Sequence, residues 1–75
     1  MQDRIKTVMA QIFNVDIGAI TDESSPENIE RWDSLRHMQL VLALEDEFGV
    51  TFSDGDIPEL LSLRAIEKSV GILAR

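Results

Sequence analysis

The hydrophobic residues near the start of the chain recur at helical spacing. Intervals of three, one, three and one residues separate the members of this first stripe, which are Ile5, Val8, Met9, Ile12 and Phe13. Such spacing places them all on one face of an α-helix. Asp3 precedes the stripe and suits a helix cap or the positive end of the helix dipole. The pattern predicts a helix over residues 3–14.

A second and longer hydrophobic stripe lies in the middle of the chain. Its members are Leu35, Met38, Leu40, Val41, Leu42, Leu44 and Phe48. Gly49 follows, and glycine is the usual residue where a helix ends in the left-handed conformation. The pattern predicts a helix over residues 34–48. Because its apolar arc is wider than a surface helix needs, we expect it to lie centrally and to contact several other elements.

The last third of the chain predicts one short helix and one longer helix. Ser53 and Asp56 both suit the start of the short helix, and Pro58 favours Asp56 because proline is tolerated in a first turn and disfavoured further inside. This third helix is predicted over residues 56–61. Ser62 then suits the N-cap of a fourth helix. The apolar positions of that helix are Leu63, Ile66, Val70 and Leu73.

A long connection separates the first two helices, from residue 14 to residue 33. Loops of this length are uncommon in small domains unless they are functional or pinned to the core. Four apolar side chains are expected as pins, namely Ile17, Ile20, Ile29 and Trp32. The sequence therefore predicts an all-α fold, with three longer helices, one short third helix and a long structured loop, in a single domain over residues 1–75.

Composition limits the classes of protein that this chain can be. It has 75 residues, 44% of them hydrophobic, and no cysteine, so disulfides and thiolate metal sites are excluded. A chain of this length has little room for a deep active-site cleft beside its core, which argues against most enzyme architectures. No apolar run approaches the length of a membrane span, and the first residues lack a signal-peptide pattern. We expect a cytoplasmic protein.

Charge is distributed unevenly along the chain. The net charge is −7, and the stretch from Asp16 to Glu59 alone carries −10 while the two ends carry +3. Such a surface repels nucleic acid and anionic membranes, and it attracts and orients partner proteins that present basic patches. The plainer alternative is that acidic residues keep a small domain soluble.

The candidate chemistry lies where the acidic connection becomes the second helix. Ser34 stands in the first turn of that helix, where a serine most simply serves as a cap. A phosphate ester on its hydroxyl would sit near unpaired N–H groups and the positive end of the helix dipole. Asp33 would repel such an ester, so we expect Asp33 to cap the helix or to contact a modifying enzyme or its metal ion.

Two other groups of residues give weaker evidence for a catalytic or metal site. Ser34 and His37 lie one helical turn apart, but no carboxylate evidently orients the histidine and no glycine-rich oxyanion site accompanies the serine. His37 is expected to face solvent or a partner. The segment Asp54-Gly55-Asp56 fails the calcium-loop pattern, so no metal site is expected in the protein itself. The remaining apolar residues are expected in the core, among them Met9, Ile12, Met38, Val41, Phe48, Ile57, Leu61 and Ile66.

The chain resembles the acyl carrier protein family over essentially its whole length. The matching segments are Asp33-Ser34-Leu35 at the head of a long helix, Leu40-Val41-Leu42-Ala43-Leu44, Glu45-Asp46-Glu47-Phe48-Gly49, Asp56-Ile57-Pro58-Glu59-Leu60 and Ser62-Leu63-Arg64-Ala65-Ile66. The resemblance implies a four-helix bundle in which Ser34, flanked by Asp33 and Leu35, receives 4′-phosphopantetheine from coenzyme A. A separate phosphopantetheinyl transferase with a divalent metal ion would attach it. The thiol of that arm would hold an acyl group as a thioester, which makes the protein a carrier and not an enzyme.

The same resemblance implies roles for further residues. Some apolar side chains of the bundle would part to admit an acyl chain, with the flexible Met38 as a gatekeeper. The candidates for this pocket are Met38, Val41, Phe48, Ile57, Leu61 and Ile66. Partner enzymes, either acyl ligases and transferases or synthases with basic docking patches, are expected to contact a second group. This group consists of Trp32, Arg36, Gln39, Glu45, Asp46 and Glu47. We expect the protein to be a monomer.

The chain also departs from the carriers of fatty-acid synthesis. Those carriers usually have acidic residues after the serine motif, where this chain has Arg36 and Gln39, and small residues where it has Arg31 and Trp32. A basic synthase partner would meet a weaker and partly reversed potential beside Ser34. We therefore hypothesise a carrier dedicated to a specialised pathway. An aminoacyl or peptidyl carrier and a non-covalent helical adaptor remain as alternatives.

Overall fold

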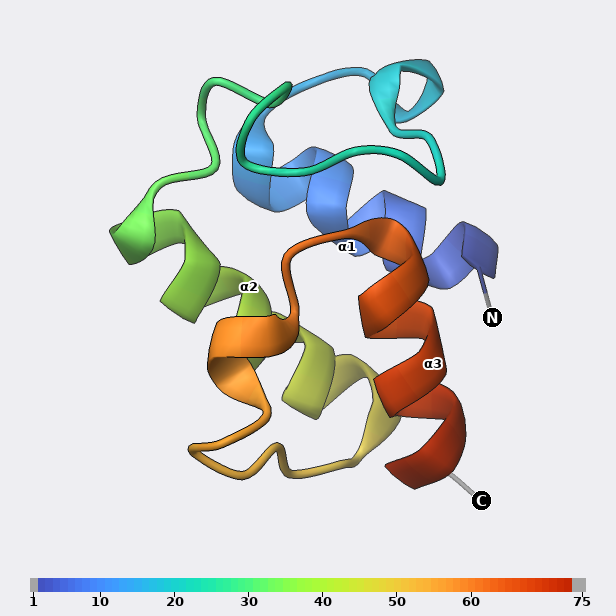
Figure 1. The fold of residues 1–75 in the computed structure, drawn as a ribbon. Helices are drawn as coiled ribbons and strands as arrows, with labels where there is room; N and C mark the ends of the chain where they lie inside the picture. Colours follow the sequence, from blue (N-terminus) through green and yellow to red (C-terminus); the bar gives the residue numbers. More distant parts are fainter. Residues whose placement is uncertain (1, 74–75) are drawn as a thin grey trace.

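The computed structural model describes residues 2–73, which form three α-helices and two short 3-10 turns (Figure 1). The helices are α1 (Gln2–Phe13), α2 (Ser34–Phe48) and α3 (Leu63–Leu73), and the 3-10 turns are η1 (Ile17–Ala19) and η2 (Ile57–Glu59). No strand occurs within the described residues. The prediction of an all-helical fold is confirmed.

Capping residues fix the ends of the helices near where the sequence placed them. Asp33 is the N-cap of α2, and its side chain accepts the backbone N–H of Arg36 at 2.8 Å. Gly49 closes α2 in the left-handed region with φ of 64°. Ser62 precedes α3, and its hydroxyl oxygen accepts the N–H of Ala65 at 3.0 Å. These interactions determine where the loops meet the helices. The Asp33 cap in particular sets the start of α2 and hence the position of Ser34.

The predicted third helix is a single 3-10 turn, η2, so the expected span of 56–61 was too long. Asp56 does not cap it. Its carboxylate instead accepts the hydroxyl of Ser53 at 2.9 Å. Pro58 is tolerated in this first turn, and the helical geometry ends at Leu60, where ψ is 55°.

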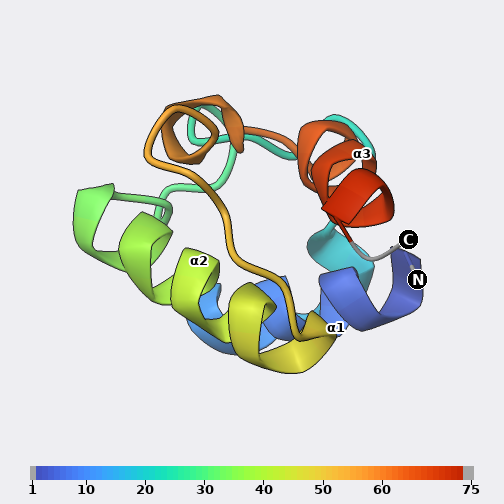
Figure 2. The same cartoon turned by 90° about the horizontal axis from the view of Figure 1, so that it is seen from below.

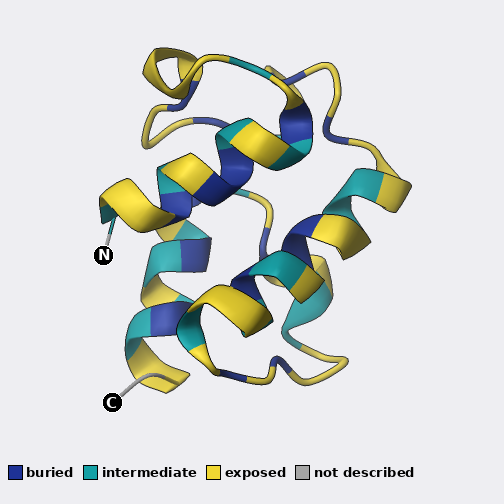
Figure 3. Ribbon diagram, turned by 180° about the vertical axis from the view of Figure 1, so that it is seen from behind, coloured by how far each residue is buried: buried dark blue, intermediate teal, exposed yellow. Residues whose placement is uncertain are grey.

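The core lies between the inner faces of the three helices, as the buried positions in Figure 3 show. Only three positions of α2 are buried. The rest of its wide apolar arc faces solvent, with Leu35 68% and Leu42 61% exposed. The outer face of α2 is therefore exposed. Its inner face packs against α1, and its His37 contacts Trp32 of the connection and Ile57 of η2, so the expectation that α2 contacts several other elements is confirmed. Met38 and Leu61 are also exposed and not part of the core. The buried helical residues are Ile5, Val8, Met9, Phe13, Leu40, Val41, Leu44, Leu63, Ile66 and Val70.

The long connection between α1 and α2 is pinned to the core at three of the four predicted positions. Ile20, Ile29 and Trp32 are buried, whereas Ile17 is 48% exposed because η1 turns it outward. The ring of Trp32 lies 4.8 Å from that of Phe13, centroid to centroid. Figure 1 shows the connection passing over α1 before it enters α2.

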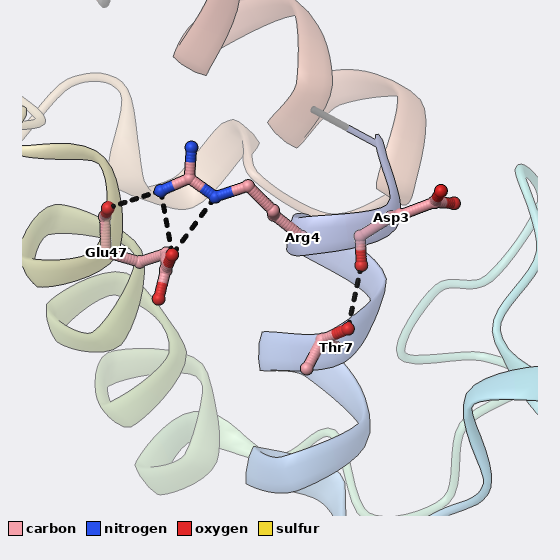
Figure 4. Close-up of polar contacts among 4 residues, drawn as sticks. All are labelled: Asp3, Arg4, Thr7 and Glu47. Carbon is pink, nitrogen blue, oxygen red and sulfur yellow. Dashed lines mark hydrogen bonds and ion pairs between the residues drawn. The ribbon is translucent and has the colours of Figure 1, made fainter.

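The start of α1 is joined to the end of α2 by Arg4 and Glu47 (Figure 4). The guanidinium of Arg4 donates to the Glu47 carboxylate at 2.7 Å and to its backbone carbonyl at 2.9 Å. It also lies 4.6 Å above the ring of Phe48. Among residues 2–73, no helix is both long and apolar enough to cross a membrane.

Candidate functional site

Ser34 is the first residue of α2 and is exposed to solvent. Within the described part of the chain, its hydroxyl forms no hydrogen bond. The preceding Asp33 takes the capping position, so the serine hydroxyl is not needed to hold the helix. The structure thus presents a free primary hydroxyl beside the N–H groups at the positive end of a helix of 15 residues.

Arg36 offsets the negative charge of Asp33 next to that hydroxyl. The Arg36 guanidinium lies 3.1 Å from the Asp33 carboxylate, one turn along α2. The expectation that Asp33 caps the helix is confirmed, and the cap and the ion pair together hold its carboxylate toward Arg36. A negatively charged group on Ser34 would therefore meet less repulsion from Asp33 than the sequence suggests.

An apolar groove of about 660 Å³ opens beside Ser34, between the connection, α2 and η2. The turn η2 lies across from the first half of α2, as Figure 2 shows, and supplies one wall. The groove is lined by Pro26, Trp32, Asp33, Ser34, His37, Met38, Ile57, Pro58 and Leu61. The serine hydroxyl and an apolar cavity are therefore adjacent.

The six residues predicted for an acyl pocket fall into two groups. Met38, Ile57 and Leu61 line the groove. Val41 and Ile66 are buried in the core, and Phe48 lies under Arg4 at the far end of α2. The resemblance implied these six as pocket candidates, but the sequence could not distinguish a wall residue from a core residue, because that depends on where η2 packs.

The residues predicted to contact partners also divide. Trp32 is only 5% exposed, so its prediction as a partner contact is corrected: burial against Phe13 removes its ring from the surface. Glu45 accepts the backbone N–H of Phe52 at 2.8 Å, and Glu47 is bound by Arg4. Within residues 2–73 the side chains of Gln39 and Asp46 are exposed and form no hydrogen bond.

His37 has a structural position that the sequence did not reveal. The expectation that it faces solvent or a partner is wrong, because both ring nitrogens are engaged inside the protein. Trp32 Nε1–H donates to His37 Nδ1 at 3.0 Å, and His37 Nε2 lies 2.8 Å from the carbonyl oxygen of Ile57. Neither nitrogen is directed at Ser34 as a base would be. The sequence signal that could have indicated this contact between the two rings is that the one tryptophan lies five residues before the one histidine.

The site fits a covalently attached phosphopantetheine arm. Ser34 supplies an accessible hydroxyl for a phosphate ester, the start of α2 favours its charge, and the groove offers apolar surface to whatever the arm carries. Within the described residues, no three acidic or histidine side chains converge as a metal site would require.

Comparisons with known proteins agree with this geometry. Residues 3–70 match the family described as "Phosphopantetheine attachment site". Among solved structures, the chain is similar to the solution NMR structure of a holo acyl carrier protein from Geobacter metallireducens. The two share 29% sequence identity with a TM-score of 0.85, over 96% of this chain and 83% of that chain. The chain belongs to the family of carrier proteins that bear a covalent phosphopantetheine arm.

Proposed function

We propose that this protein is an acyl carrier protein, in which the Ser34 hydroxyl bears 4′-phosphopantetheine. The observation that supports this most directly is the free, exposed Ser34 hydroxyl at the start of α2, directly beside an apolar groove. When bound, the arm supplies a terminal thiol that holds an acyl group as a thioester. The protein presents this group to partner enzymes and performs no catalysis of its own.

The residues around Ser34 position the arm. Asp33 fixes the first turn of α2 by accepting the N–H of Arg36, so the serine is held on a rigid element and not on a loop. Arg36 offsets the charge of Asp33 beside the phosphate ester. The remaining N–H groups of the first turn favour the ester's negative charge.

The groove is the proposed shelter for an apolar acyl chain. Met38 from α2 and Ile57 and Leu61 around η2 provide side chains that can cover it, and Met38 and Leu61 are exposed enough to move without disturbing the core. Val41 and Ile66 are buried in the core, do not line the groove and are not proposed to contact the acyl chain.

Attachment tests the proposal. The purified chain is incubated with coenzyme A, magnesium and a broad-specificity phosphopantetheinyl transferase, and its intact mass is measured. One added phosphopantetheine is expected, and Ser34→Ala is expected to abolish the gain. Ser69→Ala, which changes a serine on α3, is the matched control and should still be modified. An unchanged mass in the parent protein would instead favour the non-covalent adaptor.

The exposed face of α2 next to Ser34 is the proposed docking surface for partners. It presents Arg36, Gln39 and Asp46 together with the exposed side chains Leu35 and Leu42. Its one basic and one acidic side chain offset each other and the other three are an amide and two apolar side chains, so it would offer little attraction to a strongly basic patch. We therefore propose that the carrier serves a dedicated pathway and not general fatty-acid elongation.

Charge reversal at Arg36 tests this specificity. With a general fatty-acid synthase enzyme as partner, Arg36→Asp is expected to raise kcat/KM of the loaded carrier because it adds the acidic charge that such partners attract. Arg36→Gln is the control: it removes the positive charge and the guanidinium contact with Asp33, but it adds no negative charge. Equal use of the parent and Arg36→Asp would contradict the proposal. The thioester cargo of protein isolated from its native cells would distinguish an acyl from an aminoacyl or peptidyl carrier.

A further inference from the structure

A relay of two contacts runs through His37 and connects the core to the wall of the groove. At one end, Trp32 is buried against Phe13 and donates its indole N–H to His37 Nδ1. At the other end, His37 Nε2 meets the carbonyl oxygen of Ile57, the first residue of η2. The imidazole and indole rings are also nearly parallel, at 25° with centroids 6.1 Å apart. His37 thus joins the connection, α2 and η2 at one point.

The partners of the ring determine its protonation state. An indole N–H can only donate, so Nδ1 must accept, and a carbonyl oxygen can only accept, so Nε2 must carry the proton. A neutral imidazole with its proton on Nε2 satisfies both contacts. An imidazolium carries a second N–H on Nδ1, which would then face the indole N–H of Trp32. The relay is therefore complete only while His37 is neutral.

The turn η2 is short and is held by few backbone contacts besides the one with His37: Ile57 N–H donates to the Ser53 carbonyl at 3.2 Å and Glu59 N–H to the Asp56 carbonyl at 3.0 Å. It is one 3-10 turn, and its closing hydrogen bond, from Leu60 N–H to the same Ile57 carbonyl, is long at 3.3 Å. Ile57 and Pro58 of this turn, with the following Leu61, form one wall of the groove beside Ser34. The contacts of Ile57, including the one with His37, therefore help to set the position of that wall.

The charged groups around the relay are engaged elsewhere or exposed. On the side of α2, Asp33 is paired with Arg36. At η2, Asp56 is bonded to Ser53 and Glu59 is exposed, and on the connection Arg31 is exposed. Within residues 2–73 His37 takes part in no ion pair. No described carboxylate is therefore placed to compensate a positive charge on the ring.

We propose that His37 is a proton-sensitive positioning residue for the groove beneath Ser34. Neutral His37 ties η2 to Trp32 and holds the groove wall in place. Uptake of a proton at Nδ1 breaks the link to Trp32 and leaves a buried indole N–H without its acceptor. The Nε2–H of His37 still donates to Ile57, so η2 stays bound to His37 but is no longer tied through it to Trp32. The effect of His37 on an attached acyl chain rests on the proposed function, since it changes how the groove covers the chain at that same site.

Nuclear magnetic resonance of the 75-residue chain tests the relay without any attached arm. The chain has one tryptophan and one histidine, so each ring gives a single, unambiguous set of signals. As pH falls through the range of about 5 to 8 in which histidines change charge, the Trp32 indole signal and the amide signals of Ile57 and Leu61 are expected to change with the same midpoint as the His37 ring nitrogens. Titration of His37 with no accompanying change at Trp32 would overturn the proposal.

Three substitutions separate positioning from simple packing. His37→Asn places an amide oxygen near Nδ1 and keeps an acceptor for Trp32, His37→Gln reaches Ile57 instead, and His37→Phe keeps a ring and loses both contacts. Below the midpoint measured for the His37 ring nitrogens, exchange of the indole proton with water is expected to be about tenfold faster in the parent than in His37→Asn, because only the parent loses its acceptor on protonation. Equal exchange in these two proteins would contradict the proposal.

The loaded carrier tests the consequence for cargo. In protein bearing an octanoyl thioester, contacts between the acyl chain and the side chains of Ile57 and Leu61 are measured by nuclear Overhauser effects at pH 7.5 and pH 5.5. These contacts are expected to weaken at low pH in the parent and to change less in His37→Asn; an equal change in both would count against the relay. Failure of Ser34 to accept the arm would remove only this last experiment, since the indole measurement needs no arm.

Discussion

Asp33 shows how one side chain prepares the attachment residue beside it. One carboxylate oxygen accepts the N–H of Arg36 and the other meets the Arg36 guanidinium. The ion pair is exposed and contributes little to stability, whereas the cap satisfies a helix N–H that would otherwise lack a protein partner. The capping contact should therefore dominate the effect of substitutions at this position.

Asp33→Ala is expected to lower the free energy of unfolding by about 1 kcal/mol, the usual cost of losing an N-cap. Asp33→Asn keeps an oxygen that can accept the same N–H and should lose only a few tenths of that. Urea denaturation of the three proteins measures the difference. If the Asp33→Asn and Asp33→Ala proteins are equally destabilised, then the charge of Asp33 and not its capping contact stabilises this end of α2.

At the same scale, the sequence predicted the serine but not the histidine. Ser34 could be found because its position depends on local signals, a cap followed by a helical stripe. The role of His37 depends on Ile57, which is 20 residues away and reaches it only after η2 has folded back. Trp32 was assigned both a core and a surface role from sequence, and the structure retains only the first.

Among the elements, those with both a periodic stripe and a capping residue were predicted well. The observed bounds of α1, α2 and α3 lie within about one residue of the stripes and caps that predicted them. The predictions failed where a local signal competed with packing. Asp56 and Pro58 indicated a helix, but the buried Leu60 already leaves the helical region, so the segment forms one 3-10 turn only.

Two glycines provide a matched test of helix geometry. Neither Gly49 nor Gly71 has an atom within 4 Å of where a Cβ would stand, so neither substitution causes a clash. Gly49 has φ of 64°, which costs an alanine about 1 kcal/mol, so Gly49→Ala should destabilise the protein. Gly71 lies inside α3, and Gly71→Ala should stabilise it by roughly 0.5–1 kcal/mol.

Thermal or urea denaturation of the two variants checks these opposite signs. Because both substitutions add the same methyl group in open space, the difference between them isolates backbone conformation. A stabilising Gly49→Ala would mean that α2 does not end in the left-handed conformation.

At the scale of the whole molecule, most acidic side chains form no ion pair with a cation among residues 2–73. The net charge is −7, and within residues 2–73 only Asp33 and Glu47 form ion pairs. The last turn of α2 contains no basic residue, although Glu45, Asp46 and Glu47 occur where the helix dipole favours positive charge. The folded state therefore gathers like charges that the unfolded chain would keep further apart.

Raising sodium chloride from 20 to 300 mM is expected to increase Tm by about 3 to 6 °C, because salt screens this repulsion. Asp46→Asn removes one exposed charge at the negative end of α2, so it should raise Tm at low salt and reduce the further gain from salt. Differential scanning calorimetry measures both. A Tm that does not depend on ionic strength would contradict this account.

The burial of Trp32 also has a practical consequence. It is the one indole of the chain, and it lines the cavity where the proposed cargo would rest. Ultraviolet emission from that ring responds to the polarity of its surroundings, so arrival and departure of cargo should alter the native fluorescence directly. Loading enzymes, unloading enzymes and their inhibitors could then be assayed continuously on the unlabelled protein, with no dye and no separation step.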